Sequence, residues 1–350
     1  MKYVHVPFCR SFCTYCDFYS ETACRGKDIE GYLQSLEKEA AQRPAQGIPT
    51  LYIGGGTPSV LSPIDLERIV NAVGGAPEGE FTMEVNPEDI VQKGLPYAAA
   101  LKSLGVNRIS MGVQSLDDGI LRWMNRRHDS ARALEAFTIL REAGFDNISV
   151  DVIFGISHLE DAVLEDTLAR ILSWEPEHIS AYQLSIEEGS ALASLVAKGR
   201  YREASDEHCR RQYALICSAL SGYDHYEISN WAKKGFRAVH NAAYWTREPY
   251  VGLGPGAHSL IKEGGTERRT WNSCTPAGWT SDGETLFPEQ ILRERIMLGL
   301  RTSDGIPSSL CPPDALERLL AQGSLIRIGD TVRIPEDKFF VSDSVILDLI

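Results

Sequence analysis

The sequence predicts an α/β protein, a partial (β/α)6 barrel followed by a small α+β module. Two observations lead to this expectation. Six short β-rich runs alternate with amphipathic helical patterns along the first half of the chain, and beyond about residue 220 this alternation stops. Six β–α units in series predict a parallel sheet with right-handed crossovers. A full eight-unit barrel needs roughly 250 residues, so six units that end near residue 190 fit a partial one.

The six runs have the length and the Val, Ile, Phe and Tyr content of strands. Helix signals lie between them. Ser62 followed by Pro63 supplies a cap residue and then proline at the first helical position. Asp129-Ser130 opens a second helix, which Gly144 ends as a C-terminal glycine. The expected strands are Tyr3–Val6, Thr50–Ile53, Phe81–Val85, Arg108–Met111, Ile148–Ile153 and Ile179–Leu184.

Three regions are expected: a barrel core over 1–225, a loop-rich region over 226–285 that packs on the barrel, and a C-terminal module over 286–350. The middle region is rich in Tyr, Trp, Gly, His and Asn, and 264–285 reads as loop. In the C-terminal module, helical patterns over 288–300 and 313–320 precede a hairpin that turns at Gly329-Asp330. Helix followed by hairpin resembles a winged-helix module.

Composition narrows the function classes. The 350 residues carry 35 basic and 48 acidic side chains, a net charge of −13, which argues against a nucleic-acid partner. No apolar stretch approaches the ~20 residues of a membrane helix, and the N-terminus lacks a signal-peptide pattern. We therefore expect a cytoplasmic protein. In a reducing compartment its 8 cysteines favour metal binding or catalysis over disulfides.

Three of these cysteines, Cys9, Cys13 and Cys16, follow the first strand with the spacing C-x3-C-x2-C. Short loops of this kind supply thiolates to iron–sulfur clusters. Three ligands leave one iron of a [4Fe–4S] cluster open to a substrate. Zinc sites usually use four ligands in paired knuckles, so a zinc site would need His5 or Cys24 to complete it. The spacing favours the cluster.

Polar residues at the ends of later strands point to the same barrel end. Gly54-Gly55-Gly56-Thr57 follows the second strand, where glycines let the backbone approach a ligand. Alone, this run could be a tight turn. Glu84, Gln114 and Asp151 lie at or in the next three strands. A carboxylate in an apolar strand is costly unless it has a partner. Each could serve a structural hydrogen bond, but three at successive strands favour a shared polar ligand.

The chain resembles the radical S-adenosylmethionine (SAM) superfamily and, within it, the HemN/HemW group of oxygen-independent coproporphyrinogen III dehydrogenases and related haem chaperones. The resemblance rests on YVHVPFC, CTYCDF, IGGGTPS, EVNPE, NRISMGVQS, YEISNWA and HNAAYW. It implies a radical SAM barrel, a [4Fe–4S] cluster on the three cysteines, and an electron donor for that cluster. It also implies SAM contacts at Tyr3, Tyr15, Gly55, Gly56, Thr57, Glu84, Gln114, Arg126 and Asp151. Arg126 can pair with the methionine carboxylate, although Arg127 is adjacent.

Two departures separate this chain from the dehydrogenases. They have a further cysteine where this chain has Phe18, and an extra segment before the cysteine motif, whereas the motif here begins at residue 9. Both favour the haem-chaperone branch. His240, in H-N-x-x-Y-W, matches the histidine that this branch links to haem, and imidazole is a common axial ligand of haem iron. By composition alone His240 is a structural histidine.

The resemblance thus implies a haem chaperone that binds haem, the cluster and SAM and passes haem to acceptor proteins. We expect no catalytic residue beyond the cofactor site, a homodimer, and transient membrane association at most. The alternatives are a coproporphyrinogen III oxidase, a radical methyltransferase or haem-degrading relative, and a zinc-stabilised interaction protein.

Overall fold

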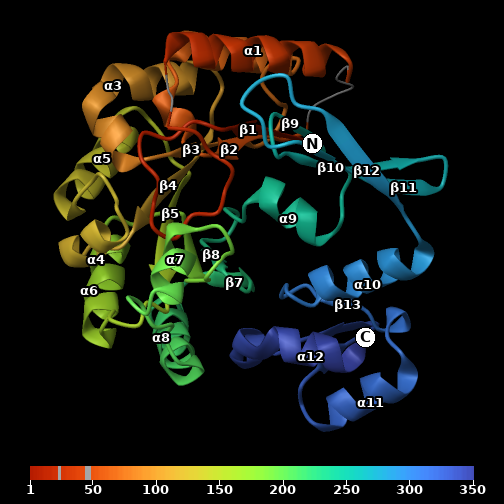
Figure 1. The fold of residues 1–350 in the computed structure, drawn as a ribbon. Helices are drawn as coiled ribbons and strands as arrows, with labels where there is room; N and C mark the ends of the chain where they lie inside the picture. The colour runs from red at the N-terminus through yellow and green to blue at the C-terminus, as the bar shows by residue number, and fades with distance from the viewer. Residues whose placement is uncertain (23–24, 44–48) are drawn as a thin grey trace.

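The computed structural model describes residues 1–22, 25–43 and 49–350. Its main sheet has nine strands in the order β7-β8-β6-β5-β4-β3-β2-β1-β9. The six expected strands lie side by side and parallel, in chain order, so the (β/α)6 prediction is confirmed. They are β1 Lys2–Val6, β2 Leu51–Gly55, β3 Phe81–Val85, β4 Arg108–Gln114, β5 Ile148–Phe154 and β6 His178–Gln183. Figure 1 shows this curved sheet in the upper left of the molecule.

Helices cover the outer face of the sheet (Figure 1). The expected cap residues begin two of them: Ser62 forms a capping box with Asp65, and the Asp129 carboxylate accepts from the Arg132 amide. Gly144 follows the second with a φ of 87°, as a C-terminal glycine should. The helices are α1 Gly26–Ala41, α2 Pro63–Ala72, α3 Pro87–Ser103, α4 Asp118–Trp123, α5 Ser130–Glu142, α6 Asp161–Leu172, α7 Ala191–Ala197 and α8 Asp206–Ala219.

One hydrophobic core lies between the strands and these helices. Val4, Ile53, Met83, Ile109 and Val150, from five successive strands, are fully buried or nearly so. Burying an aliphatic side chain of this size stabilises the fold by about 1.5–3 kcal/mol. The core therefore fixes the strands, and the strands fix where their C-terminal ends lie.

The region after α8 is more ordered than expected. Strands β7 (Asp224–Glu227) and β8 (Asn230–Ala232) extend the sheet beyond β6, and β9 (Val251–Leu253) pairs with β1. Helix α9 (Val239–Trp245) lies between them in sequence. The predicted loop over 264–285 is wrong, because β10 (His258–Glu263), β11 (Thr266–Asn272) and β12 (Ser281–Leu286) form an antiparallel sheet. These strands are polar and only partly buried, so they lack the apolar alternation that identifies strands.

The C-terminal module has the predicted order of helix and hairpin. Helix α10 (Pro288–Gly299) leads to the short strand β13 (Ile306–Pro307), and helix α11 (Pro313–Ala321) precedes β14 (Ile326–Ile328) and β15 (Thr331–Arg333). Helix α12 (Ser342–Leu349) ends the chain. The three strands form one antiparallel sheet. No helix in 1–22, 25–43 or 49–350 is both long enough and apolar enough to cross a membrane.

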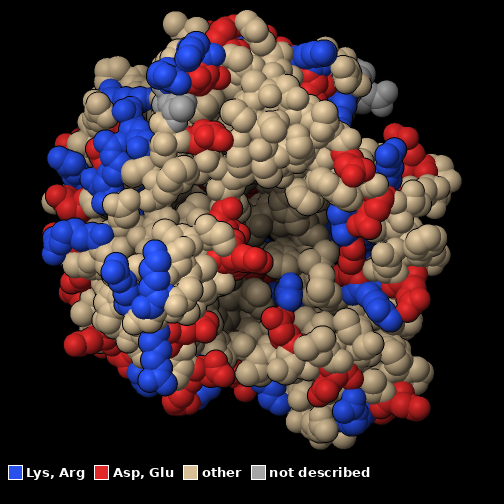
Figure 2. All heavy atoms as spheres, viewed as in Figure 1, with Lys and Arg blue, Asp and Glu red and all other residues tan. Residues whose placement is uncertain are grey.

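Figure 2 shows one face of the molecule, which is hollowed between the barrel and the C-terminal helices. Asp and Glu side chains lie along one margin of the hollow, and basic and acidic side chains alternate along the other. The cluster loop, the segment after β1 that carries Cys9, Cys13 and Cys16, crosses this same side of the barrel (Figure 1).

Candidate functional site

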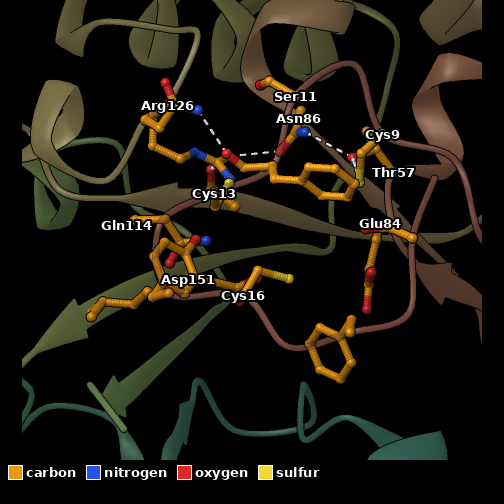
Figure 3. A pocket seen from close by; sticks show the side chains of 18 of the residues that line it. Cys9, Ser11, Cys13, Cys16, Thr57, Glu84, Asn86, Gln114, Arg126 and Asp151 are labelled. Carbon is orange, nitrogen blue, oxygen red and sulfur yellow. Dashed lines mark hydrogen bonds between the residues drawn. The ribbon is translucent and has the colours of Figure 1, made fainter. Parts of the chain in front are cut away.

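A cavity of about 480 Å³ opens at the C-terminal ends of the parallel strands. Polar and catalytic groups of α/β barrels gather at this end, since every strand delivers its last residues and its loop there. The cluster loop forms one wall, and residues from β2 to β6 form the other. Figure 3 shows labelled side chains that reach the cavity from both walls. All three cysteines and eight of the nine predicted SAM residues line it, with Tyr3 as the exception.

The cysteine thiols lie in different surroundings on one loop. Cys9 is buried, with its Sγ 3.4 Å from Oγ1 of Thr57. The Sγ of Cys13 accepts a hydrogen bond from Nη1 of Arg126 at 3.5 Å. Burial raises the pKa of the Cys9 thiol, and it raises that of Cys16 to about 11. Thiols of this kind ionise when a metal binds them, so metal binding releases their protons.

Backbone and side-chain hydrogen bonds fix the cluster loop to the barrel. The amide of Thr14 donates to the carbonyl of Met124 at 3.0 Å, and its hydroxyl donates to the carbonyl of Trp123 at 2.9 Å. Asn125 donates through its amide to the carbonyl of Phe12 at 2.7 Å. The end of α4 and the residues that follow it therefore hold both neighbours of Cys13, Phe12 and Thr14, and the cluster loop is preorganised around the second cysteine.

The glycine run gives the cluster loop room to approach β2. A Cβ atom at Gly56 would lie 2.8 Å from the Phe8 carbonyl oxygen and 3.0 Å from Sγ of Cys9. Gly55 has a φ of 108°, and a Cβ there would meet the His5 ring at 2.7 Å. The predicted close approach of backbone is thus present, and it brings the amides of this run beside the first cysteine.

Glu84, at the end of β3, is held by two donors. Its Oε1 accepts from the Tyr52 hydroxyl at 2.7 Å, and its Oε2 accepts from the Gly55 amide at 3.1 Å. Burial, opposed by the Tyr52 hydrogen bond and reinforced by the Asp151 carboxylate, raises the pKa of Glu84 to about 7. A carboxyl group that titrates near neutrality inside a cavity is typical of functional sites.

Gln114 and Asp151 complete the floor of the cavity. Gln114 has a φ of 69°, and β4 is irregular between Gly112 and Gln114, which turns this side chain inward. Its Oε1 is buried and, among the described residues, has no hydrogen-bond partner. Asp151 accepts from the Ser110 hydroxyl at 3.2 Å, and burial raises its pKa. An unpaired buried amide oxygen beside a carboxylate fits a ligand with several donors.

Arg126 is partly buried in the wall next to the cluster loop. Its Nη2 donates at 2.6 Å to both Oδ1 of Asn86 and the carbonyl of Gly112, and its Nε has no partner among the described residues. Arg127 instead pairs with the Glu88 carboxylate at 2.9 Å and is 40% exposed. Both arginines line the cavity, but Arg127 is held by an exposed ion pair, whereas Arg126 contacts the cluster loop and β4 and is the better candidate for a ligand carboxylate.

The residues present fit a [4Fe–4S] cluster and SAM. Three thiol donors face a cavity whose other wall offers backbone amides, carboxylates that include those of Glu84 and Asp151, and an unpaired amide oxygen. Within the part of the chain that the structure describes, no group of three His, Cys, Asp or Glu side chains is placed to hold one metal ion. A cubane cluster requires a different spacing, since each thiolate binds its own iron. Cys24, the alternative zinc ligand, lies outside the described residues.

Tyr3 lies one layer behind the cavity. Its hydroxyl is 3.1 Å from Nδ1 of His5, and its ring centroid is 6.0 Å from that of Tyr52, which does line the cavity. Sequence reasoning missed Tyr52, Asn86 and Ser110. The alternation of β2 placed Tyr52 on the same side as Gly54, and the N-P-E motif contains Asn86, so both had a signal in the sequence.

His240 lies in α9 near the start of β2, away from the cavity lining. It is fully buried. Its Nδ1 is 2.8 Å from the Thr50 hydroxyl, and its Nε2 is 3.0 Å from the Tyr244 hydroxyl. Burial lowers its pKa to about 3, so the imidazole stays neutral at physiological pH. A neutral imidazole is the form that ligates metals, but both nitrogens are engaged in this conformation.

Comparison with known proteins gives the family. The radical SAM superfamily model matches residues 3–171. The heme chaperone HemW of Bacillus subtilis is 35% identical over 326 residues, which cover 87% of this chain and 84% of that protein. HemW of Mycobacterium tuberculosis is 32% identical, and the alignment covers 99% of this chain and 94% of that protein. A mitochondrial radical SAM domain-containing protein 1 from Danio rerio is 31% identical, with 87% and 73% covered.

Among solved structures, coproporphyrinogen III oxidase (HemN) from Escherichia coli superposes on this chain with a TM-score of 0.82 at 19% identity. The superposition covers 99% of this chain and 89% of the HemN chain. At this identity the match shows the fold, which includes the barrel and the C-terminal module. The chain belongs to the radical SAM superfamily and, within it, to the family of the HemW proteins.

Proposed function

We propose that this protein is a haem chaperone of the HemW type, which binds haem together with a [4Fe–4S] cluster and SAM. The observation that carries the proposal is the identity of more than 30% with HemW proteins over nearly the whole chain. The arrangement of the cavity supports the cofactor part. Cys9, Cys13 and Cys16 would hold the cluster, and the cavity residues of β2 to β5 and Arg126 would hold SAM.

When bound, the reduced cluster and SAM supply an electron and a source of a 5′-deoxyadenosyl radical. The protein's own residues shape that site. Glu84 and Asp151 present negative charge to an ammonium group, Arg126 presents positive charge to a carboxylate, and the cluster loop covers the cavity. We assign no catalytic residue beyond these cofactor contacts.

His240 is our proposed haem ligand, in the region 226–285 that packs on the barrel. Its neutral imidazole supports ligation, and Tyr244, Trp245 and Tyr250 supply aromatic surface close by. Ligation requires that its hydrogen bonds to Thr50 or Tyr244 break first. Haem uptake would therefore displace α9 from its place against the barrel. We propose that residues 286–350 form a separate C-terminal module.

An oxygen-independent coproporphyrinogen III oxidase is the second candidate, favoured by the shared fold with HemN. Phe18 opposes it. The resemblance places a cysteine there in the dehydrogenases, whereas in this protein the Phe18 side chain is 65% exposed at the rim of the cavity. An apolar ring at this position supplies no thiol to the site.

One sample tests both candidates. The protein is reconstituted anaerobically, and iron, SAM binding, haem binding and conversion of coproporphyrinogen III are measured on it. We expect iron and sulfide, a haem complex, and no sustained decarboxylation. Cys13→Ser should remove the cluster, whereas Cys217→Ser, in α8, should retain it. A preparation that produces protoporphyrinogen IX steadily and takes up no haem would replace the chaperone by the oxidase.

We propose further that the protein hands haem to haem-requiring acceptor proteins, that a separate reductant donates electrons to the cluster, and that the protein forms a homodimer. Net charge supports the absence of a nucleic-acid partner. We place the protein in the cytoplasm, with transient contact at a membrane where its acceptors lie there. Sedimentation of the reconstituted protein, with and without haem, tests the dimer.

A further inference from the structure

Tyr52 occupies a position between the cavity and the interior of the barrel. It belongs to β2, and its hydroxyl donates to Oε1 of Glu84 at 2.7 Å. The ring centroid of Tyr52 lies 6.0 Å from that of Tyr3 and 5.3 Å from that of His240. The aromatic rings of β1 and α9 thus hold the Tyr52 ring, and the hydroxyl has a fixed direction.

The backbone makes room for this pair. A Cβ atom at Gly54 would lie 2.6 Å from Cε1 of Tyr52 and 2.7 Å from Oε1 of Glu84. The phenol and the carboxylate therefore meet across a residue that must be glycine. The second oxygen of Glu84 accepts from the Gly55 amide at 3.1 Å. With both oxygens held, the carboxylate has one orientation toward the cavity that it lines.

The charge of Glu84 depends on these donors. Asp151, from β5, is the charged group that opposes its ionisation, and burial opposes it as well. The neighbouring Tyr3 and Tyr52 are neutral, because burial raises the pKa of each well above its ordinary value. Ser110 of β4, which pairs with Glu84 in the sheet, is uncharged. A hydrogen bond to the carboxylate favours its charged form. The Tyr52 phenol therefore lowers the pKa of Glu84, whereas burial and Asp151 raise it.

We propose that Tyr52 is a positioning residue for the cofactor site: it holds Glu84 in one orientation and in its charged form, so that Glu84 can receive the ammonium group of an amino-acid ligand. The ligand class is an α-amino acid derivative, here the methionine end of SAM, so the inference rests on the proposed function. Tyr52 acts through Glu84 and not by its own contact with the ammonium group.

Affinity for SAM as a function of pH tests this role in the reconstituted protein. In the wild type, we expect affinity to rise as pH increases through the pKa of Glu84, near 7, and then to level off. In Tyr52→Phe the midpoint should move up by about one pH unit, because the hydrogen bond that favours the charged carboxylate is lost. At pH 6.5 the variant should bind about tenfold more weakly than the wild type.

A double-mutant cycle separates this role from a structural one. Glu84→Gln should bind SAM weakly with no dependence on pH in this range. If Tyr52 acts through Glu84, Tyr52→Phe should cause no further loss in the Glu84→Gln background. Tyr97→Phe is the matched control, since the Tyr97 hydroxyl donates to the carbonyls of Ser59 and Leu61 and does not line the cavity. Equal midpoints for the wild type and Tyr52→Phe, or additive losses in the cycle, would overturn the proposal.

The protein without SAM provides a second measurement. Because the pKa of Glu84 is raised, the free energy of unfolding should fall as pH rises between about 4.5 and 7. In Tyr52→Phe this fall should extend to higher pH. If the wild type fails to bind SAM but the extension is present, the proposed function fails and the Tyr52–Glu84 relationship stands. If the wild type binds SAM and the extension is absent, the relationship fails alone.

Discussion

Gly56 and Cys9 are so close that any side chain at position 56 would press on this cysteine, the first of the three proposed cluster ligands: a Cβ there would lie 3.0 Å from its Sγ. The Phe8 carbonyl oxygen, at 2.8 Å, closes the same space. The carbonyl oxygen belongs to the backbone, so it cannot move away at low cost. The glycine motif and the cysteine motif are thus a single structural unit.

Gly56→Ala should therefore impair the cluster. Overpacking of this kind costs about 1–3 kcal/mol, and here it falls on the cluster loop. We expect less than half of the wild-type iron per chain after anaerobic reconstitution, together with a lower unfolding temperature. Gly31→Ala is the control, because a Cβ there meets only Ala277 at 3.7 Å. Wild-type iron content in Gly56→Ala would show that the loop adapts.

Arg126→Lys should weaken SAM binding while the adjacent Arg127→Lys should not. Lysine keeps the charge but loses the fork that reaches Asn86, Gly112 and Cys13 together. We expect a loss in SAM affinity of about 10- to 100-fold, measured by equilibrium dialysis on the reconstituted protein. Arg127 forms an exposed pair with Glu88, which contributes little. Equal effects of the two substitutions would argue against Arg126 as the ligand-binding arginine.

The hydrogen bonds of His240 predict an unusual pair of gain-of-affinity variants. Thr50→Val or Tyr244→Phe frees one ring nitrogen, and each lost hydrogen bond lowers the cost of ligation. We expect haem to bind about 2- to 10-fold more tightly to either variant, measured by absorbance titration. His240→Ala should bind haem weakly. If all three variants bind haem like the wild type, another residue ligates the iron.

Glu227 predicts a pH-dependent stability that is independent of any cofactor. This carboxylate in β7 is fully buried, burial raises its pKa to about 7, and the Ser229 amide and Asn230 side chain donate to it. Between pH 4.5 and 7 the folded state binds more protons than the unfolded state, so stability falls as pH rises. The fall amounts to about 3 kcal/mol for a pKa raised from 4.5 to 7.

Urea unfolding at pH 5 and pH 8 measures this contribution. Glu227→Gln should lack the decrease in stability that Glu227 causes. The difference in the free energy of unfolding between the two pH values should therefore become smaller by that amount. Glu188→Gln, at an exposed position, should keep the wild-type difference. The remaining pH dependence in Glu227→Gln should come in part from Glu84. A difference unchanged from the wild type would mean that Glu227 does not titrate in this range.

The barrel could be predicted from sequence because its strands are buried on both sides and read as short apolar runs between helices with clear caps. Phe81–Val85 has the predicted bounds. The strands β10 to β12 could not, since they carry charged side chains such as those of Glu267, Arg268 and Arg269 in a polar sheet that is only partly buried. Pairs of side chains on neighbouring strands stabilise an antiparallel sheet of this kind, and the local sequence of one strand does not reveal these pairs.

The position of the cavity could be predicted from one rule, that the C-terminal ends of parallel strands lie at the same edge of the sheet. Glu84 and Asp151 are separated by 67 positions, yet both line the cavity. The surroundings of His240 could not be predicted from the sequence. Its motif predicts a ligand, but its hydrogen bonds to Thr50 and Tyr244 depend on how α9 packs against the barrel. The hydrogen bond from Tyr52 to Glu84 was missed for the same reason, because the alternation of β2 indicates the side on which Tyr52 lies but not its partner.

The pairing of β1 with β9 has a consequence for the order of biosynthesis. Val4 is registered against Leu253, so the strand that leads directly into the cysteines stays unpaired on one side until residues 251–253 leave the ribosome. All the proposed cofactor residues, of which His240 is the last, are synthesised before that edge is closed. A nascent chain of about 200 residues would already hold the three thiols and the strands opposite them, beside an open sheet edge. Metal loading during translation would then precede completion of the sheet, and truncation before residue 251 should yield a chain that aggregates.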